Sequence, residues 1–182
     1  MLPRTSFFAL TLGVAILLAA PSLFAGTTWG SFSLGVDHRE TVISTLTTKN
    51  ATILEEGAFS PTQGAYILAM GVPGDSHVLS SQFIFDSSQI LVGIFSKYPG
   101  EMFNFARDRF AGMYRIAWVE YGAQEYPVEA QELARAGGYE LVISENGEHA
   151  IVYDSLDFLL RLVMKKEGYT QVEIMHKKAL GL

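Results

Sequence analysis

The chain has 182 residues, of which 49% are hydrophobic and 18% charged, so it holds enough apolar material for a packed domain and does not have a disordered composition. Its formal net charge of −6 at pH 7 argues against a nucleic-acid-binding protein, because such proteins need clustered Lys and Arg. The sequence contains no cysteine, which excludes disulfides, thiol chemistry and thiolate metal sites.

The first 25 residues have the pattern of a secretory signal peptide. Arg4 gives a short positive region, Phe7 to Ala20 is apolar but short for a membrane span, and Ala25 ends a cleavage region. Cleavage there removes one positive charge, that of Arg4, and moves the net charge from −6 to −7. We therefore expect a periplasmic or secreted protein with no membrane span after cleavage. An uncleaved anchor is the alternative, because Leu23 is large for its position. Without a cysteine, the protein cannot be a bacterial lipoprotein.

Residues 37–40, with the sequence DHRE, crowd acidic and basic side chains together. Asp37 is placed to cap a helix, and Glu40, three residues on, to complete a capping box. Neighbouring helical side chains point about 100° apart, so they rarely converge on one substrate atom. The cluster therefore predicts a helix start and not a catalytic site, with His38 and Arg39 projecting into solvent.

Several segments between residues 29 and 98 have a strand pattern. The polar stretch 47–60 contains a β-prone patch at 52–54, and strands are expected at 29–34, 65–72, 78–85 and 90–98. The last two flank the polar loop 86–89 and predict a β-hairpin. In its first strand Phe83 and Phe85 face one way, and Gln82 and Ile84 face the other.

The period changes after residue 100. Apolar residues recur at three- and four-residue spacing from Phe103 to Tyr121, which predicts one amphipathic helix ended by Gly122. A weaker helix is expected over 125–138, with Pro127 at its first position.

The last third of the chain predicts further hairpins. The segment 139–154 alternates around Asn146-Gly147, a type I′ turn pair. Residues 156–166 have two interpretations: a helix capped by Ser155, or a strand that pairs with 170–176. We favour the strand, because the alternating Val172 and Ile174 need a partner.

Two of these segments resemble motifs of a known family. "LGVDHRETVISTL" resembles the glycine and capped-helix opening of BamE-like (SmpA/OmlA) small α+β cell-envelope domains, and "FIFDSSQILVGI" resembles their hairpin. The resemblance covers residues 29–98. It implies a two-layer unit that acts by binding other proteins.

The expected fold class is therefore α+β: an antiparallel sheet of hairpins packed against two or three helices, as a BamE-like two-layer unit with a C-terminal extension. After residues 1–25, residues 26–182 are expected to form a single α+β domain. A degenerate tandem of 26–98 and 99–182 is the alternative.

Catalytic and metal-binding patterns are weak. Residues 74–77, with the sequence GDSH, resemble the nucleophile block of GDSL-type esterases, but no Asp-x-x-His follows to supply the base. The four histidines, His38, His77, His149 and His176, lack the spacing of a metal site. We expect no catalytic residue, no metal and no cofactor.

Aromatic side chains between residues 103 and 118 exceed what one helix face can bury. The candidate binding residues are Phe105, Tyr114 and Trp118. The sequence therefore predicts an exported, non-catalytic binding or scaffold domain, whose partner is another envelope or secreted protein or a small apolar ligand. The alternative is a secreted hydrolase or esterase that uses Ser76 and His77.

Overall fold

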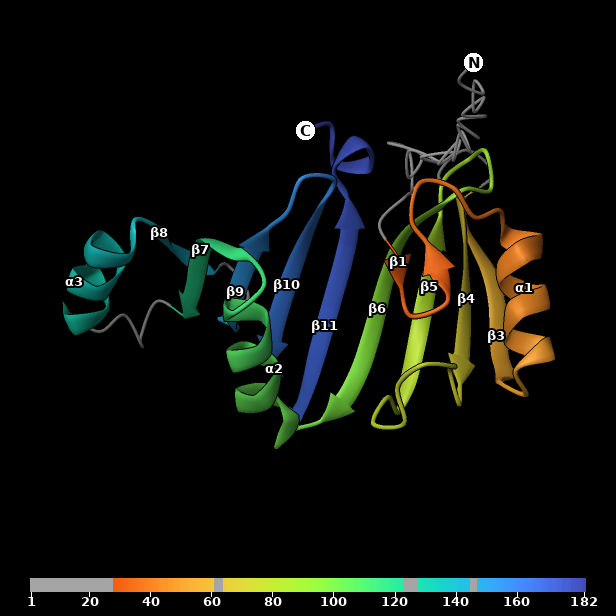
Figure 1. Cartoon of the computed structure of the whole chain (residues 1–182), viewed down its shortest axis with the longest axis horizontal. Coiled ribbons are helices and arrows are strands. Elements are labelled where there is room, and N and C mark those ends of the chain that lie inside the picture. Colours follow the sequence, from red (N-terminus) through yellow and green to blue (C-terminus); the bar gives the residue numbers. More distant parts are fainter. Residues whose placement is uncertain (1–27, 61–63, 123–127, 145–146) are drawn as a thin grey trace, which may run out of the picture.

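A nine-stranded sheet runs along the molecule (Figure 1). The computed structural model describes residues 28–60, 64–122, 128–144 and 147–182, so the expected signal peptide of residues 1–25 lies outside the described residues. The strands of the sheet are β3 (Thr52–Ser60), β4 (Gly64–Met70), β5 (Ser80–Phe85), β6 (Leu91–Pro99), β7 (Arg115–Gly122), β8 (Glu140–Ser144), β9 (His149–Asp154), β10 (Phe158–Met164) and β11 (Tyr169–His176). The other elements are the small hairpin of β1 (Thr28–Trp29) and β2 (Phe32–Ser33), the helices α1 (Arg39–Thr48), α2 (Met102–Ala111) and α3 (Val128–Gly137), and the 3₁₀ helix η1 (Lys177–Leu180).

The order of strands across the sheet is β3-β4-β5-β6-β11-β10-β9-β7-β8. Helix α1 is followed by the antiparallel meander β3 to β6, and α2 by a second meander of β7, β9, β10 and β11. The last strands of the two meanders, β6 and β11, pair antiparallel and join the halves into one sheet. Helix α3 and β8 are inserted in the second half, where β8 lies parallel to β7, an arrangement that needs a crossover connection. The tandem division of residues 26–182 stays a prediction.

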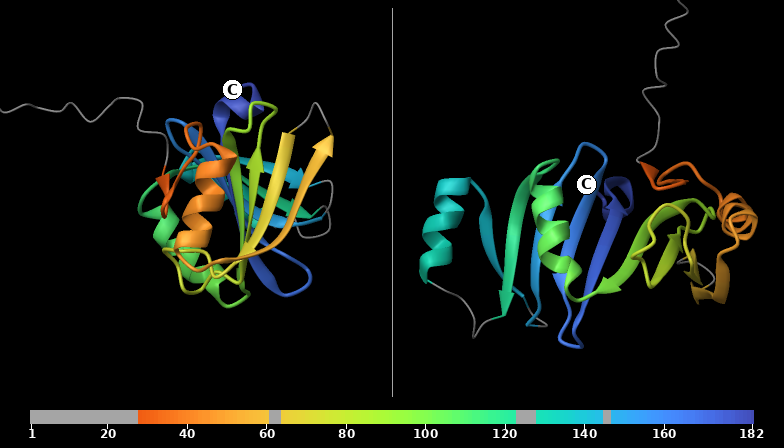
Figure 2. Two further views of the ribbon diagram at one scale, coloured as in Figure 1. Left: turned by 90° about the vertical axis from the view of Figure 1, so that its right-hand side faces the viewer. Right: turned by 60° about the horizontal axis from the view of Figure 1, so that its bottom comes forward.

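One face of the sheet is covered and the other is open (Figure 2). Helices α1 and α2 and the β1–β2 hairpin lie on the same side of the sheet. Along β5, Ser81, Phe83 and Phe85 are buried on the covered side, whereas the alternating Gln82 and Ile84 are half-buried. This period-two pattern is what a sheet with one packed face requires. The hydrophobic core therefore lies between the sheet and the elements on its covered side.

The expected fold class is wrong. Among the described residues strands hold more residues than helices do, the main sheet is mixed, and the helices cover only part of one face. The protein is thus mostly β and is not an antiparallel sheet packed on two or three helices. Two local errors caused the mistake, one at residues 103–121 and one at residues 139–154.

The single helix expected over residues 103–121 is instead a helix and a strand. Helix α2 ends at Ala111, and β7 begins at Arg115. The apolar spacing continues through residues 112–114, so periodicity alone did not reveal the break. The β-branched and aromatic residues of β7 are stable as a strand because β9 and β8 pair with its two edges.

The hairpin expected over residues 139–154 is also wrong, because β8 and β9 are not neighbours. Strand β7 lies between them, parallel to β8 and antiparallel to β9. Of the predicted turn pair, Asn146 lies outside the described residues, as does Pro127 of the expected second helix. That helix is present as α3. The hairpin around residues 86–89 is confirmed by β5 and β6, and the strand interpretation of residues 156–166 is confirmed by β10 and its partner β11.

The expected cap of α1 is wrong by one residue. His38 occupies the N-cap position without a side-chain cap, and Asp37 instead accepts a hydrogen bond from the backbone N–H of Ser33 at 2.7 Å. Arg39, which was expected to project into solvent, is half-buried and forms an ion pair with Glu56 of β3. The DHRE cluster therefore fastens the start of α1 to its neighbours and does not form a capping box.

Candidate binding site

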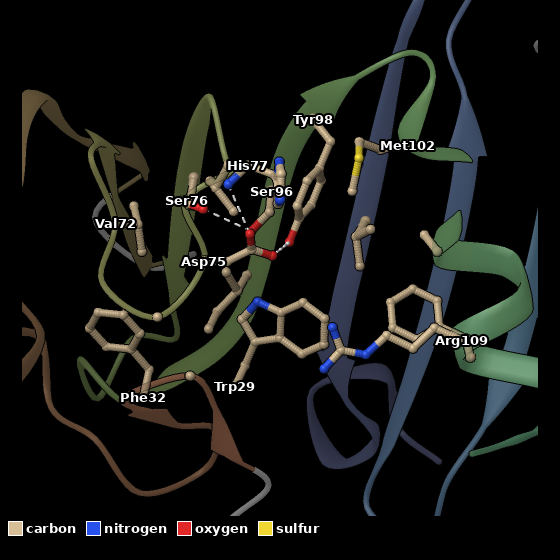
Figure 3. A pocket seen from close by; sticks show the side chains of 18 of the residues that line it. Trp29, Phe32, Val72, Asp75, Ser76, His77, Ser96, Tyr98, Met102 and Arg109 are labelled. Carbon is tan, nitrogen blue, oxygen red and sulfur yellow. Dashed lines mark hydrogen bonds between the residues drawn. The ribbon is translucent and has the colours of Figure 1, made fainter. Parts of the chain in front are cut away.

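A cavity of about 470 Å³ lies on the covered face of the sheet. Its floor is formed by β5, β6 and β11, and its walls by the β1–β2 hairpin, the loop between β4 and β5, and α2 (Figure 3). It therefore draws on both halves of the chain. Its aromatic lining residues include Trp29, Phe32, Phe83, Phe105, Phe110 and Tyr114. The volume and the mainly apolar lining are typical of sites for small organic ligands.

Helix α2 presents one stripe of side chains to this cavity. The stripe residues are Met102, Phe105, Ala106, Arg109 and Phe110. Their three- and four-residue spacing places them on one side of a helix. The neighbouring Arg107 and Asp108 are not among the lining residues and pair with each other at 2.8 Å. The stripe is thus apolar except for Arg109.

Asp75 fixes the loop between β4 and β5 over the cavity. Its Oδ1 accepts a hydrogen bond from the backbone N–H of His77 at 2.9 Å, and its Oδ2 accepts one from the hydroxyl of Tyr98 at 3.2 Å. Burial raises the pKa of Tyr98, and the charge and hydrogen bond of Asp75 raise it further, while the charge of Arg109 acts in the opposite direction. Tyr98 therefore stays neutral and donates to Asp75 across the physiological pH range.

Two glycines allow the cavity wall to close. Gly30, in the turn between β1 and β2, has a φ of +60°, and Gly74 has a φ of +103°. A Cβ on Gly30 would lie 3.3 Å from the carbonyl oxygen of Pro73, and one on Gly74 would lie 3.5 Å from the Cα of Gly30. The turn and the loop meet backbone to backbone here, and positive φ favours glycine at both positions.

The structure separates the three candidate binding residues. Phe105 and Tyr114 line the cavity, but Trp118 lies in β7 on the open face, where its Nε1 donates to Oε1 of Glu120 at 3.1 Å. Ser76 and His77, of the alternative hydrolase hypothesis, also line the cavity and are exposed.

Sequence reasoning missed several lining residues. The stripe of α2 contains a signal for Arg109, which follows Phe105 and Ala106 at helical spacing. No local pattern pointed to Trp29, because it reaches the cavity through the β1–β2 hairpin, whose position depends on the whole sheet. Asp75 belongs to the GDSH segment, but nothing in that segment indicated its bond to Tyr98.

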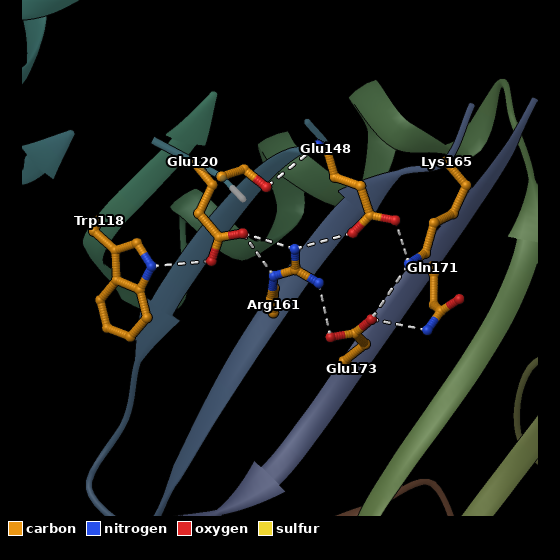
Figure 4. Close-up of polar contacts among 8 residues, drawn as sticks. Trp118, Glu120, Glu148, Arg161, Lys165, Gln171 and Glu173 are labelled. Carbon is orange, nitrogen blue, oxygen red and sulfur yellow. Dashed lines mark hydrogen bonds and ion pairs between the residues drawn. The ribbon is translucent and has the colours of Figure 1, made fainter. Parts of the chain in front are cut away.

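The open face carries a charged cluster around Arg161 of β10 (Figure 4). The guanidinium of Arg161 donates to Glu120 at 2.6 Å, to Glu148 at 3.2 Å and to Glu173 at 3.1 Å, and Lys165 donates to Glu148 at 2.7 Å. Burial alone would raise the pKa of Glu148, but the hydrogen bonds from Lys165 and Arg161 outweigh it and hold that pKa below its usual value. The cluster has nearly balanced charges that satisfy one another, which indicates a structural role.

Within residues 28–60, 64–122, 128–144 and 147–182, no group of three or more His, Asp or Glu side chains is arranged to hold a metal ion. None of the helices described there has the length and hydrophobicity to span a membrane. Comparison with family models, curated proteins and solved structures finds no match to this chain. The resemblance to BamE-like domains therefore stays a prediction, and function is argued from the site itself.

Proposed function

We propose that this protein is an exported, non-catalytic binding domain that holds a small apolar ligand in the cavity beside α2. The observation that carries the proposal is the cavity itself, with its volume of about 470 Å³ and its aromatic walls. A solvent-accessible pocket of this size with a mainly apolar lining is typical of a site for a small organic ligand. Of the two partners expected from the sequence, it favours a small ligand over another envelope protein.

The rim of the cavity supports the same proposal. Phe105 and Met113 line it, yet 59% and 58% of their surfaces are exposed to solvent. Exposed apolar side chains around an opening mark a surface that another molecule covers. Methionine side chains, here Met102 and Met113, adapt their shape to the ligand they contact.

The location of this binding function rests on the sequence. The signal-peptide pattern of residues 1–25 supports export to the periplasm or the medium. A chain without cysteine needs no oxidising chemistry to fold there.

The proposal is tested with N-phenylnaphthylamine, a neutral apolar dye whose fluorescence rises in apolar surroundings. The wild-type protein is expected to bind the dye saturably, at about one molecule per chain. Ala106 lies in the α2 stripe, so Ala106→Trp fills the cavity and is expected to weaken dye binding at least tenfold. Ala111 is exposed on the same helix and does not line the cavity, so Ala111→Trp is the matched control.

Thermal unfolding and near-UV circular dichroism establish that both variants are folded. Equal dye binding by folded Ala106→Trp and Ala111→Trp would contradict the proposal, as would the absence of saturable binding to the wild type.

A second candidate function is an esterase, because Asp75, Ser76 and His77 lie together at the cavity (Figure 3). The carboxylate of Asp75 accepts from the backbone N–H of His77, whereas a catalytic triad needs it to orient the imidazole. Hydrolysis of p-nitrophenyl butyrate separates the two functions. Activity that the wild type has and Ser76→Ala lacks would support the esterase and overturn a purely binding role.

A further inference from the structure

We propose that the ligand of this cavity is an amphiphile with an anionic head group, and that Arg109 binds this head group. The inference rests on the proposed function, since it specifies the chemistry of the molecule held in the same cavity.

Arg109 differs from the other charged side chains of its helix. It belongs to the α2 stripe and lines the cavity, whereas Arg107 and Asp108 do not and pair with each other. Among the lining residues that the structure describes, Arg109 is the only Arg or Lys. The cavity therefore has aromatic walls with one permanent positive charge at the level of α2.

Arg109 also differs from most other arginines of the protein in having no ion pair among the described residues. Four other arginines each have a carboxylate within 4.0 Å: Arg39, Arg107, Arg115 and Arg161. Arg109 has none among the described residues, and neither does Arg135 of α3, which does not line the cavity. A guanidinium has five N–H donors in a fork that matches a carboxylate or phosphate group. Arg109 presents this fork beside an apolar cavity.

Asp75 is the acidic residue among the described residues that line the cavity, and both of its carboxylate oxygens accept hydrogen bonds. One of its oxygens accepts from the backbone of His77 and the other from Tyr98. These bonds connect the loop between β4 and β5, which forms one wall of the cavity, to Tyr98 of β6. A cationic head group would pair with Asp75, and decyltrimethylammonium tests that outcome, whereas an anionic head group meets Arg109, which has no carboxylate partner among the described residues.

The arrangement fits a molecule with two ends. Arg109 is exposed, so a head group bound to it lies at the rim, in contact with water. An apolar tail then extends from the rim over the buried Phe110 toward the sheet, where Phe83 is fully buried. A tail in this position is removed from water, which is the main driving force for binding an alkyl chain.

The test uses four ligands with the same ten-carbon tail: decanoate, decanol, decyl phosphate and decyltrimethylammonium. The affinity of each ligand is measured by its displacement of N-phenylnaphthylamine from the wild-type protein at pH 8 and low ionic strength. Each ligand is kept below its own critical micelle concentration. Decanoate or decyl phosphate is expected to bind about tenfold more tightly than decanol, as is typical of one partly exposed charge-assisted hydrogen bond. The comparison between decanoate and decyl phosphate shows which anion the site prefers, and a preference for either over decanol supports the proposal.

The variants are Arg109→Gln and its matched control Arg107→Gln on the outer side of the same helix. Arg109→Gln is expected to reduce the preference for the anion over decanol to about twofold or less, and Arg107→Gln to keep it near tenfold. Raising the salt concentration to about 0.5 M is expected to shrink the wild-type preference, since exposed charges are screened.

Equal affinity of the wild type for decanoate, decyl phosphate and decanol would overturn the anionic head group and leave the proposed function intact. Tightest binding of decyltrimethylammonium would overturn it too, as would an anion preference that survives in Arg109→Gln. If the dye itself does not bind to the wild type, the proposed function fails and this inference fails with it.

Discussion

The carboxylate of Asp75 accepts a hydrogen bond of 3.2 Å from the hydroxyl of Tyr98, although the two residues are 23 positions apart in the chain. Tyr98 is buried in β6, at the centre of the sheet, and Asp75 lies in the loop that forms one wall of the cavity. The bond therefore anchors the loop to a strand of the sheet. The cavity keeps its shape because this loop is held in place.

Replacement of Asp75 by alanine tests this arrangement. Asp75→Ala removes two hydrogen bonds, one to Tyr98 and one to the backbone of His77, and is expected to lower the free energy of unfolding by about 1–2 kcal/mol. It is also expected to weaken dye binding, because the loop is no longer fixed over the cavity. Urea unfolding and dye titration measure the two effects.

Asp86→Ala is the matched control for this variant. Asp86 also accepts two backbone hydrogen bonds, from Ser88 and Ile90, in the turn between β5 and β6, but it does not line the cavity. It is expected to lose similar stability with unchanged dye affinity. If Asp75→Ala lost stability and kept the wild-type affinity, the loop would not be a functional wall.

The charged cluster on the open face is expected to be sensitive to the loss of its centre. Arg161→Met leaves Glu120, Glu148 and Glu173 close together, each with a side chain at most 15% exposed. Breaking such a partly buried network typically costs about 3 kcal/mol. Chemical denaturation of the variant measures this loss.

Arg115→Met provides the comparison on the same sheet. Arg115 pairs with Asp154 at 3.4 Å but is 77% exposed, and pairs of this kind contribute about 0.5 kcal/mol or less. Similar losses in both variants would show that the cluster around Arg161 is no stronger than an ordinary surface pair.

The acid side of the stability profile follows from the same cluster. The pKa of Glu148 is lower in the folded protein than its ordinary value of 4.5, because Lys165 and Arg161 stabilise its ionised form. The ionised form therefore stabilises the fold above that ordinary value, and the contribution is lost as the pH falls through the folded pKa. The pKa of Asp154 is likewise lower than its ordinary value of 3.8, because Lys177 and then Arg115 stabilise the ionised form, so its contribution to stability is also lost as the pH falls.

Stability measured by urea unfolding is thus expected to fall as the pH decreases below about 4.5. Glu148→Gln has no group to protonate at this position, so its profile is expected to be flatter in this window and lower at neutral pH. Profiles of the wild type and Glu148→Gln that run parallel from pH 6 to pH 3 would rule out this role for Glu148.

The sequence predicted local features well and long-range pairing poorly. The hairpin around residues 86–89 was predictable because turn residues and alternation on both sides coincide within one short segment. The place of β7 was not, because its neighbours β8 and β9 both come later in the chain and one of them is parallel to it. A turn pair such as Asn146-Gly147 predicts a reversal of the chain, but it does not predict that a third strand lies between the two segments.

In the candidate site, too, local features were predictable and long-range contacts were not. Phe105 could be predicted as a binding residue because the aromatic side chains of this segment exceed what one helix face can bury, and Tyr114 lies just beyond the helix at the same cavity. A helix that continued through residues 112–114 would place Trp118 with them, but the helix ends at Ala111. The strand at β7 instead places it on the opposite face of the sheet. Trp29 reaches the cavity only because the β1–β2 hairpin folds back over β5 and β6, which no local pattern reveals.

The most direct test of a ligand site in the cavity uses the two tryptophans of the protein, Trp29 in the cavity and Trp118 on the open face. Bromine quenches tryptophan fluorescence on contact, so a neutral bromoalcohol, ω-bromoundecanol, reports which tryptophan the ligand reaches. In Trp118→Phe, where Trp29 alone emits, saturable quenching is expected. In Trp29→Phe, where Trp118 alone emits, little quenching is expected. Quenching confined to Trp118, or none in either variant, would contradict a ligand site in the cavity.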